Sequence, residues 1–370
     1  MNLENPKKFA MLVEQAKQVA DNFYRPISRK YDKAEHAYPK ELDMLASLLD
    51  GMNEGSSEAT GATSASKRPS TDGDSGVRNS GNLSAALGAM ELCRGDVGLL
   101  LSIPRQGLGN AAIGAVANDE QLARFKGKWA AMAITEPSCG SDSAAIRTTA
   151  VKEGDDYILN GEKIYVTAGA RAECVVVWAT LDKSLGKAAI KSFVVEHGTP
   201  GMEITRLEHK LGIKASDTAA ILFTNCRVPA ANLLGSPEID LKKGFAGVME
   251  TFDNTRPLVA AMAVGVAAAS IERLKELLAG HIDANYGTLP LNASHAEATL
   301  YRLEAEWEAA RLLTLKAAWM ADNKRPNSKE ASICKAKAGR VANEVTLKCV
   351  ELAASLGYGE DELLEKWSRD

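Results

Sequence analysis

The chain has 370 residues, 45% of them hydrophobic and 25% charged, a composition typical of a soluble globular protein with two or three domains. A net charge of −4 gives no reason to expect a nucleic-acid or membrane-surface partner, and no apolar run approaches the length that spans a bilayer. The six cysteines are scattered, without a C-x-x-C pair or a histidine at ligand spacing, so we expect a reducing, cytoplasmic location and no metal site.

The first third of the chain is predicted to be helical. Apolar residues recur at helical spacing in residues 6–50, which predicts two helices, and helical patterning returns after residue 83. Between them, residues 53–82 are rich in Gly, Ser, Thr and Asp and predict a mobile surface loop. We therefore assign residues 1–130 to an N-terminal all-α domain.

Residues 131–236 change to an alternating pattern with frequent turn signals, which predicts a small β domain, either a barrel or a sandwich. An apolar run at 131–134 predicts a strand, followed by a loop of small residues, hydroxyls and one proline at 135–142. Such a loop exposes successive backbone N–H groups that can hold an anion such as a pyrophosphate. An ordinary turn explains the same residues equally well.

The Asn160-Gly161 pair lies between two apolar runs and predicts a β-hairpin. Alternation then divides the second strand into two faces, with Ile164 and Val166 on one and Lys163, Tyr165 and Thr167 on the other. An aromatic ring and a hydroxyl two residues apart suit a flat heteroaromatic ligand. A half-exposed sheet face would show the same pattern.

Residues 237–370 are predicted to form a C-terminal antiparallel four-helix bundle. Three long helices are expected at about 245–278, 293–323 and 328–356, and Pro257 predicts a kink or a local break in the first.

Five motifs in this order resemble those of the flavin-dependent acyl-CoA dehydrogenases, in particular the medium-chain-like branch. They are TEPSCGSD at 135–142, LNGEKIYVT at 159–167, KLGIKASDT at 210–218, RVPAANLLG at 227–235 and FDNTRP at 252–257. The resemblance implies the acyl-CoA dehydrogenase fold, a multidomain α+β architecture with the three parts described above.

The resemblance also implies a function: FAD-dependent oxidation of an acyl-CoA thioester to the trans-2-enoyl-CoA in fatty-acid β-oxidation, with an electron-transfer flavoprotein as acceptor. The residues that it places at FAD are Met132, Ala133, Ile134, Thr135, Ser141, Tyr165 (where the family usually has Trp), Val166 and Thr167. It places Ser141, Asp253 and Arg256 at the substrate, although an ion pair on one helix face would also explain Asp253 and Arg256. The identity of the acyl chain is not predicted.

The catalytic base has no counterpart among these residues. In the medium-chain-like branch the base is a Glu in a Glu-Gly-Thr loop beyond an Arg-Asp pair, which is Arg369-Asp370 here. Other branches place the base at the position of Thr255, whose hydroxyl cannot serve. We therefore expect a base C-terminal to Asp370 or in a partner chain.

The family also supplies Arg and Gln side chains to the FAD pyrophosphate across a subunit interface, and these positions read Asp283, His295 and Glu351 here. Losing a charge-assisted hydrogen bond costs about 1.5–3 kcal/mol, and like charges repel by up to about 4 kcal/mol. We therefore expect a hetero-oligomer, a heterotetramer in which a paralogous subunit supplies the missing donors. The alternatives are a homotetramer that holds FAD by other contacts and a non-catalytic scaffold subunit that stabilises an active paralogue.

Overall fold

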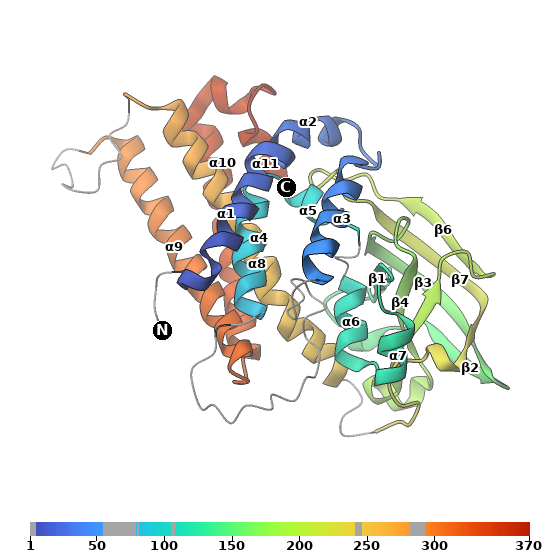
Figure 1. Cartoon of the computed structure of the whole chain (residues 1–370). Helices are drawn as coiled ribbons and strands as arrows, with labels where there is room; N and C mark the ends of the chain where they lie inside the picture. Colours follow the sequence, from blue (N-terminus) through green and yellow to red (C-terminus); the bar gives the residue numbers. More distant parts are fainter. Residues whose placement is uncertain (1–4, 55–78, 80, 105–107, 241–245, 282–292) are drawn as a thin grey trace.

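The computed structural model describes residues 5–54, 79, 81–104, 108–240, 246–281 and 293–370. Long helices form one side of the molecule and a curled β-sheet forms the other, with the short helices α3, α6 and α7 beside the sheet (Figure 1). The helices that precede the sheet in the chain are α1 (Ala10–Val19), α2 (Arg25–Lys33), α3 (Glu41–Glu54), α4 (Gly81–Cys93), α5 (Val97–Leu100), α6 (Leu108–Val116) and α7 (Asp119–Arg124). The predicted loop at 53–82 lies almost entirely outside the described residues.

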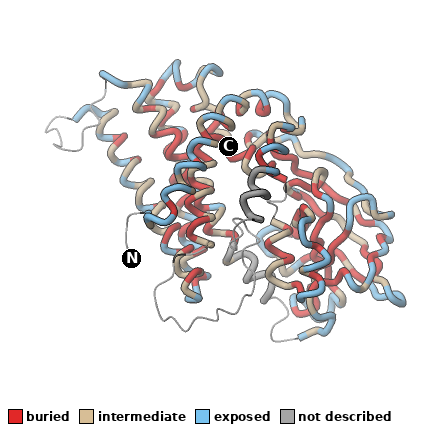
Figure 2. Tube along the Cα trace, viewed as in Figure 1, coloured by how far each residue is buried: buried red, intermediate tan, exposed pale blue. Residues whose placement is uncertain are grey.

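The long helices share one apolar core with helices from the N-terminal part. Helix α4 packs on α8 and α9, and α1 packs on α4, so buried residues from both ends of the chain form one cluster, part of the red interior in Figure 2. The helices that follow the sheet are α8 (Ala246–Leu277), α9 (His295–Asp322), α10 (Ser328–Tyr358) and α11 (Leu364–Arg369). Because α4 completes the packing, the bundle draws on both ends of the chain.

Helix α8 runs continuously through Pro257, so the local break allowed for in the prediction does not occur. Among the described helices, one stretch of α8, Thr255–Leu277, is long and apolar enough by length and composition to cross a membrane, with a mean hydropathy of 1.5. Its most apolar part is 67% buried inside the protein, as expected for the central helix of a bundle.

The middle part is one seven-stranded sheet. Its order is β1-β4-β2-β3-β7-β6, with β5 on the free side of β4; β1 and β2 run parallel to β4, and the other pairs are antiparallel. The strands are β1 (Ala130–Ala133), β2 (Thr149–Glu153), β3 (Asp156–Thr167), β4 (Cys174–Thr180), β5 (Ile190–Glu196), β6 (Met202–Leu207) and β7 (Thr218–Pro229). The predicted fold class, helical at both ends with a small β domain between, is confirmed.

The predicted hairpin turn at Asn160-Gly161 is wrong. Both residues lie inside β3, and the turn of the β2–β3 hairpin is at Gly154, which has a φ of 62°. Glycine is needed at 161 for a different reason: a Cβ there would lie 2.4 Å from the Thr148 hydroxyl oxygen. The Asn-Gly pair therefore lies at an irregularity in the β3–β7 pairing, where Thr148 packs against the backbone of Gly161.

The predicted alternation along the end of β3 is also wrong. A register shift against β7 falls between Lys163 and Val166 and adds a residue to the strand. Lys163 is fully buried, whereas Tyr165 is 62% exposed. The bulge thus separates Lys163 from Tyr165 and Thr167, with which it was predicted to share a face.

Candidate functional site

A cavity of about 640 Å³ lies between the helical and the β parts of the molecule, a volume within the usual range for small-molecule and cofactor sites. Its walls come from the N-terminus of α6, from β1 and the loop after it, from the end of β3 and from α8. The lining residues are Leu108, Met132, Ile134, Thr135, Gly140, Ser141, Asp142, Ser143, Ala144, Ile164, Tyr165, Thr167 and Arg256.

Most residues predicted to bind the cofactor line this cavity. They are Met132, Ile134, Thr135, Ser141, Tyr165 and Thr167. Ala133 and Val166 do not line it: both are fully buried and belong to the core of the sheet. They can support the site only through the backbone and packing of their strands.

The two β walls of the cavity are joined by the backbone. The Ile164 N–H donates to the Thr135 carbonyl at 2.9 Å, and the Lys163 ammonium donates to the Ile134 carbonyl at 3.2 Å. The hydroxyl-bearing loop is thereby held against the end of β3, which keeps Thr135 and Tyr165 on the same cavity.

A buried ion pair beneath the cavity reinforces this join. Lys163 Nζ lies 2.7 Å from Glu136 Oε1, and neither side chain is more than 4% exposed. Glu136 also accepts hydrogen bonds from the Arg147 N–H at 2.6 Å, from the Thr148 N–H at 2.9 Å and from the Thr148 hydroxyl at 2.6 Å. One carboxylate therefore fastens both ends of the loop 135–148 to β3.

The pKa values of this pair follow from burial and contact. Burial alone would raise the pKa of Glu136, but the Lys163 charge and the hydrogen bonds it accepts outweigh burial and lower that pKa below its usual 4.5. Burial lowers the pKa of Lys163, and Glu136 offsets only part of that effect. The carboxylate is thus held ionised and serves the structure of the site.

Tyr165 has a strained backbone at the edge of the cavity. Its φ of 57° lies in the left-handed region, which is uncommon for an aromatic residue. The bulge in β3 imposes this conformation and leaves the ring largely exposed, so that it can contact a ligand. Sequence alternation could place Tyr165 on a face but could not reveal the bulge.

Helix α8 contributes a cation to the opposite wall. Arg256 lines the cavity, and its guanidinium lies 2.8 Å from Asp253 Oδ1 in an ion pair one turn apart. The Ser328 hydroxyl donates to the other oxygen of Asp253. Asp253 is not among the described lining residues, so it positions Arg256, and the helix-face ion pair considered from the sequence does form. Thr255, on the same turn, is buried.

Several residues that line the cavity were not predicted from the sequence: Leu108, Gly140, Asp142, Ser143, Ala144 and Ile164. Four of these follow Thr135 in or just after the predicted loop, and that loop was the available signal. Leu108 could not be found, because it reaches the cavity only where α6 packs on β1; a Cβ on Gly109 would lie 2.2 Å from the Ala131 carbonyl oxygen.

The residues predicted to weaken phosphate binding are only partly described. Asp283 lies outside the described residues. His295 begins α9 and is exposed. Glu351 is exposed on α10 and pairs with Lys348 at 2.5 Å, which offsets its charge. Of the two acidic residues predicted at this position, only Glu351 is described, and Lys348 offsets its negative charge.

The cavity fits one wall of a flavin site. It presents a largely exposed aromatic ring, several hydroxyl groups and one guanidinium, around a glycine at 140 that leaves the backbone open to close approach. Ring face, hydroxyl donors and a cation are the groups that a planar heteroaromatic ring and an attached anion require.

Two sequence models of one family match the chain. "Acyl-CoA dehydrogenase, middle domain" matches residues 131–226, and "Acyl-CoA dehydrogenase, C-terminal domain" matches residues 242–370, so that together they cover well over half of the chain. The first match includes both β walls of the cavity, and the second includes Arg256.

Individual proteins give the same result. The chain is 36% identical over 246 residues to acryloyl-CoA reductase (NADH) of Anaerotignum propionicum, covering 66% of this chain and 61% of that protein. It is 36% identical over 239 residues to the mitochondrial short-chain specific acyl-CoA dehydrogenase of Rattus norvegicus, covering 64% and 56%. The chain thus matches less than two thirds of the length of these relatives.

Solved structures match over the whole chain. Butyryl-CoA dehydrogenase from Megasphaera elsdenii has a TM-score of 0.83 at 29% identity, covering 100% of this chain and 94% of that one. A chain from a structural study of the electron transferring flavoprotein of Acidaminococcus fermentans also has a TM-score of 0.83, at 30% identity, covering 100% and 93%.

Proposed function

Because the chain belongs to the acyl-CoA dehydrogenase family, we propose that it catalyses, with FAD, the oxidation of a short-chain acyl-CoA thioester to the trans-2-enoyl-CoA. The observation that carries the proposal is the single cavity on which Thr135, Tyr165, Thr167 and Arg256 meet. The short-chain preference rests on the names of the relatives, among them butyryl-CoA dehydrogenase and the short-chain specific enzyme.

The chain's own residues have distinct tasks in this reaction. Tyr165, Thr135 and Thr167 would hold the flat cofactor, through one aromatic ring and two hydroxyl groups that line the cavity. Ser141 and the open backbone at Gly140 receive the phosphate end. FAD, when bound, supplies the hydride acceptor. Arg256, held by Asp253, provides a fixed positive charge near the substrate.

Removal of the α-proton requires a carboxylate in a site from which water is excluded. Of the described residues that line the cavity, only Asp142 carries a carboxylate, and its side chain is exposed to solvent. Thr255 has no group that accepts a proton at neutral pH. We therefore assign the base to a carboxylate outside the described residues, in this chain or in a partner subunit.

We also propose that the chain forms a hetero-oligomer. The main support is Asp283, the acidic residue that stands where the family has an arginine for the FAD pyrophosphate. Glu351 is paired with Lys348, so its charge alone does not repel a phosphate strongly. A paralogous subunit would supply the cationic and amide donors that the family places at the FAD pyrophosphate, and an electron-transfer flavoprotein would accept the electrons.

The reaction is tested with the FAD-loaded protein, purified alone and after co-expression with a paralogue from the same source. We expect butyryl-CoA to bleach the visible flavin band under anaerobic conditions and to yield a product lighter by two hydrogens. A flavin that stays oxidised in both preparations, with butyryl-CoA and with longer acyl-CoA thioesters, would contradict the proposed activity.

The same preparations test the assembly. We expect full flavin content only in the co-expressed complex. A fully loaded homotetramer of this chain alone would contradict the hetero-oligomer but would leave the dehydrogenase activity standing. A complex whose flavin spectrum and turnover are unchanged by Thr167→Val would favour the scaffold role for this chain.

A further inference from the structure

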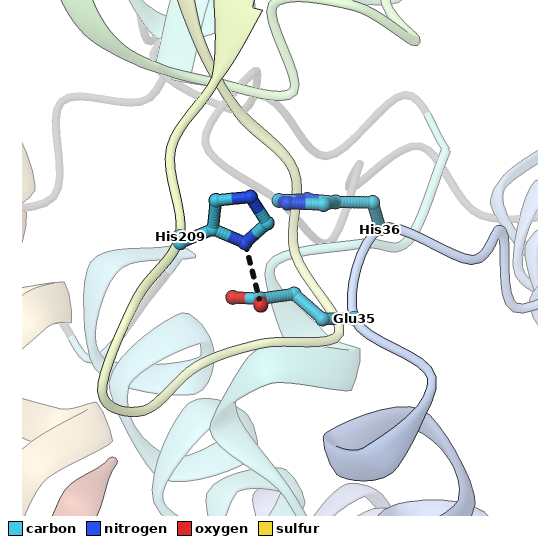
Figure 3. A group of neighbouring side chains, drawn as sticks. All are labelled: Glu35, His36 and His209. Atoms are coloured by element: carbon cyan, nitrogen blue, oxygen red, sulfur yellow. Dashed lines mark hydrogen bonds and ion pairs between the residues drawn. The ribbon is translucent and has the colours of Figure 1, made fainter.

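Two histidines and a glutamate converge at the junction between the N-terminal helices and the β part, and none of the three is among the described residues that line the cavity. Glu35 and His36 lie in the turn after α2, and His209 lies in the segment after β6 (Figure 3). From this cluster we propose that Glu35, His36 and His209 bind one divalent transition-metal ion of the zinc class. The scattered cysteines gave no reason to expect a metal site, and His209 is 174 residues from Glu35 in the sequence.

The geometry is close to that of a three-ligand site. One ligand atom from each side chain lies within 4.8 Å of the others, and Glu35 Oε2 is 3.0 Å from His209 Nδ1. A tetrahedral zinc ion with bonds of about 2.0–2.1 Å holds its ligand atoms about 3.3 Å apart. One edge of the tetrahedron is thus already present, and the others close by about 1.5 Å at most. The side chain of His209 is 84% exposed and can turn to close them without disturbing the core.

His36 is the residue that a simple ion pair does not explain. Both of its ring nitrogens are buried and have no hydrogen-bond partner among the described residues. A buried polar group without a partner costs about 1–3 kcal/mol. The rings of His36 and His209 lie 5.1 Å apart, centroid to centroid, so the unpartnered nitrogens are next to two further ligand groups. Coordination of one nitrogen would give this imidazole a partner that the Glu35–His209 contact does not provide.

The turn that carries the ligands is held in place by the β part. The second oxygen of Glu35 accepts the Lys210 N–H at 2.9 Å, which orients the carboxylate as an outer-shell contact does at metal sites. Arg171 donates to the His36 and Ala37 carbonyls at 3.3 and 3.0 Å. The cluster is therefore fixed from both segments before any ion binds.

The ligand types select the ion. Two imidazoles and a carboxylate suit zinc and its neighbours in the first transition series better than calcium or magnesium, which prefer oxygen ligands alone. Solvent at the exposed side of His209 supplies the fourth position. Bound there, the ion would cross-link the turn after α2 to the segment after β6 and stabilise the folded chain.

The test uses the full chain after chelator treatment, titrated with Co²⁺ as a spectroscopic probe and then with Zn²⁺. Variants His36→Asn and His209→Gln each remove one ligand, and asparagine tolerates the positive φ of 68° at position 36. His197→Gln, at an exposed histidine after β5, is the matched control. Tm with chelator present shows that each variant is folded.

We expect one Co²⁺ per chain, with a tetrahedral absorption spectrum free of thiolate charge-transfer bands. Outer-shell substitutions weaken metal binding about 10–100-fold, so loss of a ligand in His36→Asn or His209→Gln should weaken it by at least about 100-fold. Zn²⁺ should raise the Tm of the original chain and of His197→Gln only. Equal binding by all four proteins, a thiolate-type spectrum, or full binding by His36→Asn would overturn the proposal. None of these readouts depends on flavin or on acyl-CoA.

Discussion

The buried pair Glu136–Lys163 allows a sharp test of how the cavity is held together. In Glu136→Gln the buried Lys163 ammonium loses its charged partner and keeps only neutral acceptors, the new amide oxygen and the Ile134 carbonyl at 3.2 Å. The new amide group would also bring a donor to face the Arg147 or Thr148 donors. Removing one partner of a buried ion pair costs about 3–5 kcal/mol, so we expect that loss in the free energy of unfolding.

The assay is urea unfolding at neutral pH, with Glu162→Gln as the matched control. Glu162 lies on β3 next to Lys163, its side chain is 39% exposed, and its carboxylate is 3.9 Å from the Arg206 guanidinium. Its replacement should therefore lower the free energy of unfolding by less than about 1 kcal/mol. In the double variant Glu136→Gln/Lys163→Met no charge remains buried at this position, and part of the lost stability should return.

Two results would refute this reasoning. One is an unfolding midpoint for Glu136→Gln that equals that of Glu162→Gln. The other is a double variant no more stable than Glu136→Gln, because the cost could not then come from an uncompensated buried charge.

Three further predictions concern the same framework. The pKa of Glu136 is lowered in the folded chain, so the stability that its carboxylate contributes is complete above about pH 4.5 and is lost as the pH falls through the folded pKa. Urea unfolding midpoints should therefore drop more steeply below pH 4.5 in the original chain than in Glu136→Gln. Parallel curves of midpoint against pH would contradict this. Gly109→Ala puts a Cβ 2.2 Å from the Ala131 carbonyl oxygen and should lower the free energy of unfolding, measured by thermal unfolding, by about 1–3 kcal/mol or more. Gly114→Ala lies in the same helix, where a Cβ would meet open space, and should leave that free energy unchanged or raise it. Burial raises the pKa of Cys226 and Cys334 to about 11 and that of Cys174 and Cys349 to about 12, so a thiol reagent near neutral pH should label the native chain far more slowly than the urea-unfolded chain, and rapid native labelling would contradict their burial.

The fold could be predicted from the sequence because period and length separate its parts. Helical spacing over long stretches predicted helices that the structure places at His295–Asp322 and Ser328–Tyr358, within a few residues of the expected bounds. The role of α4 could not be predicted, since its packing on α8 depends on contacts between distant parts of the chain.

The local errors lie at one strand, β3. Asn-Gly is a strong hairpin signal, but here the close crossing of Thr148 requires the glycine. Alternation fails beyond Lys163 because the bulge adds a residue, and a one-residue shift reverses every later side chain. The partner of Lys163, 27 residues away, could not be found from spacing, although a lysine in an apolar strand next to a turn motif was a signal of an unusual position.

The central claim, that the cavity at Thr135, Tyr165 and Thr167 holds the flavin, is tested most directly by titrating FAD into the flavin-free co-expressed complex and into the same complex carrying Thr167→Val, with Thr224→Val as control. Thr224 is exposed on β7 and is not among the residues that line the cavity. A lost hydrogen bond is worth about 0.5–1.5 kcal/mol, so we predict FAD binding about 2- to 10-fold weaker and a shifted flavin spectrum in Thr167→Val only. Identical affinities and spectra for all three proteins would contradict the claim.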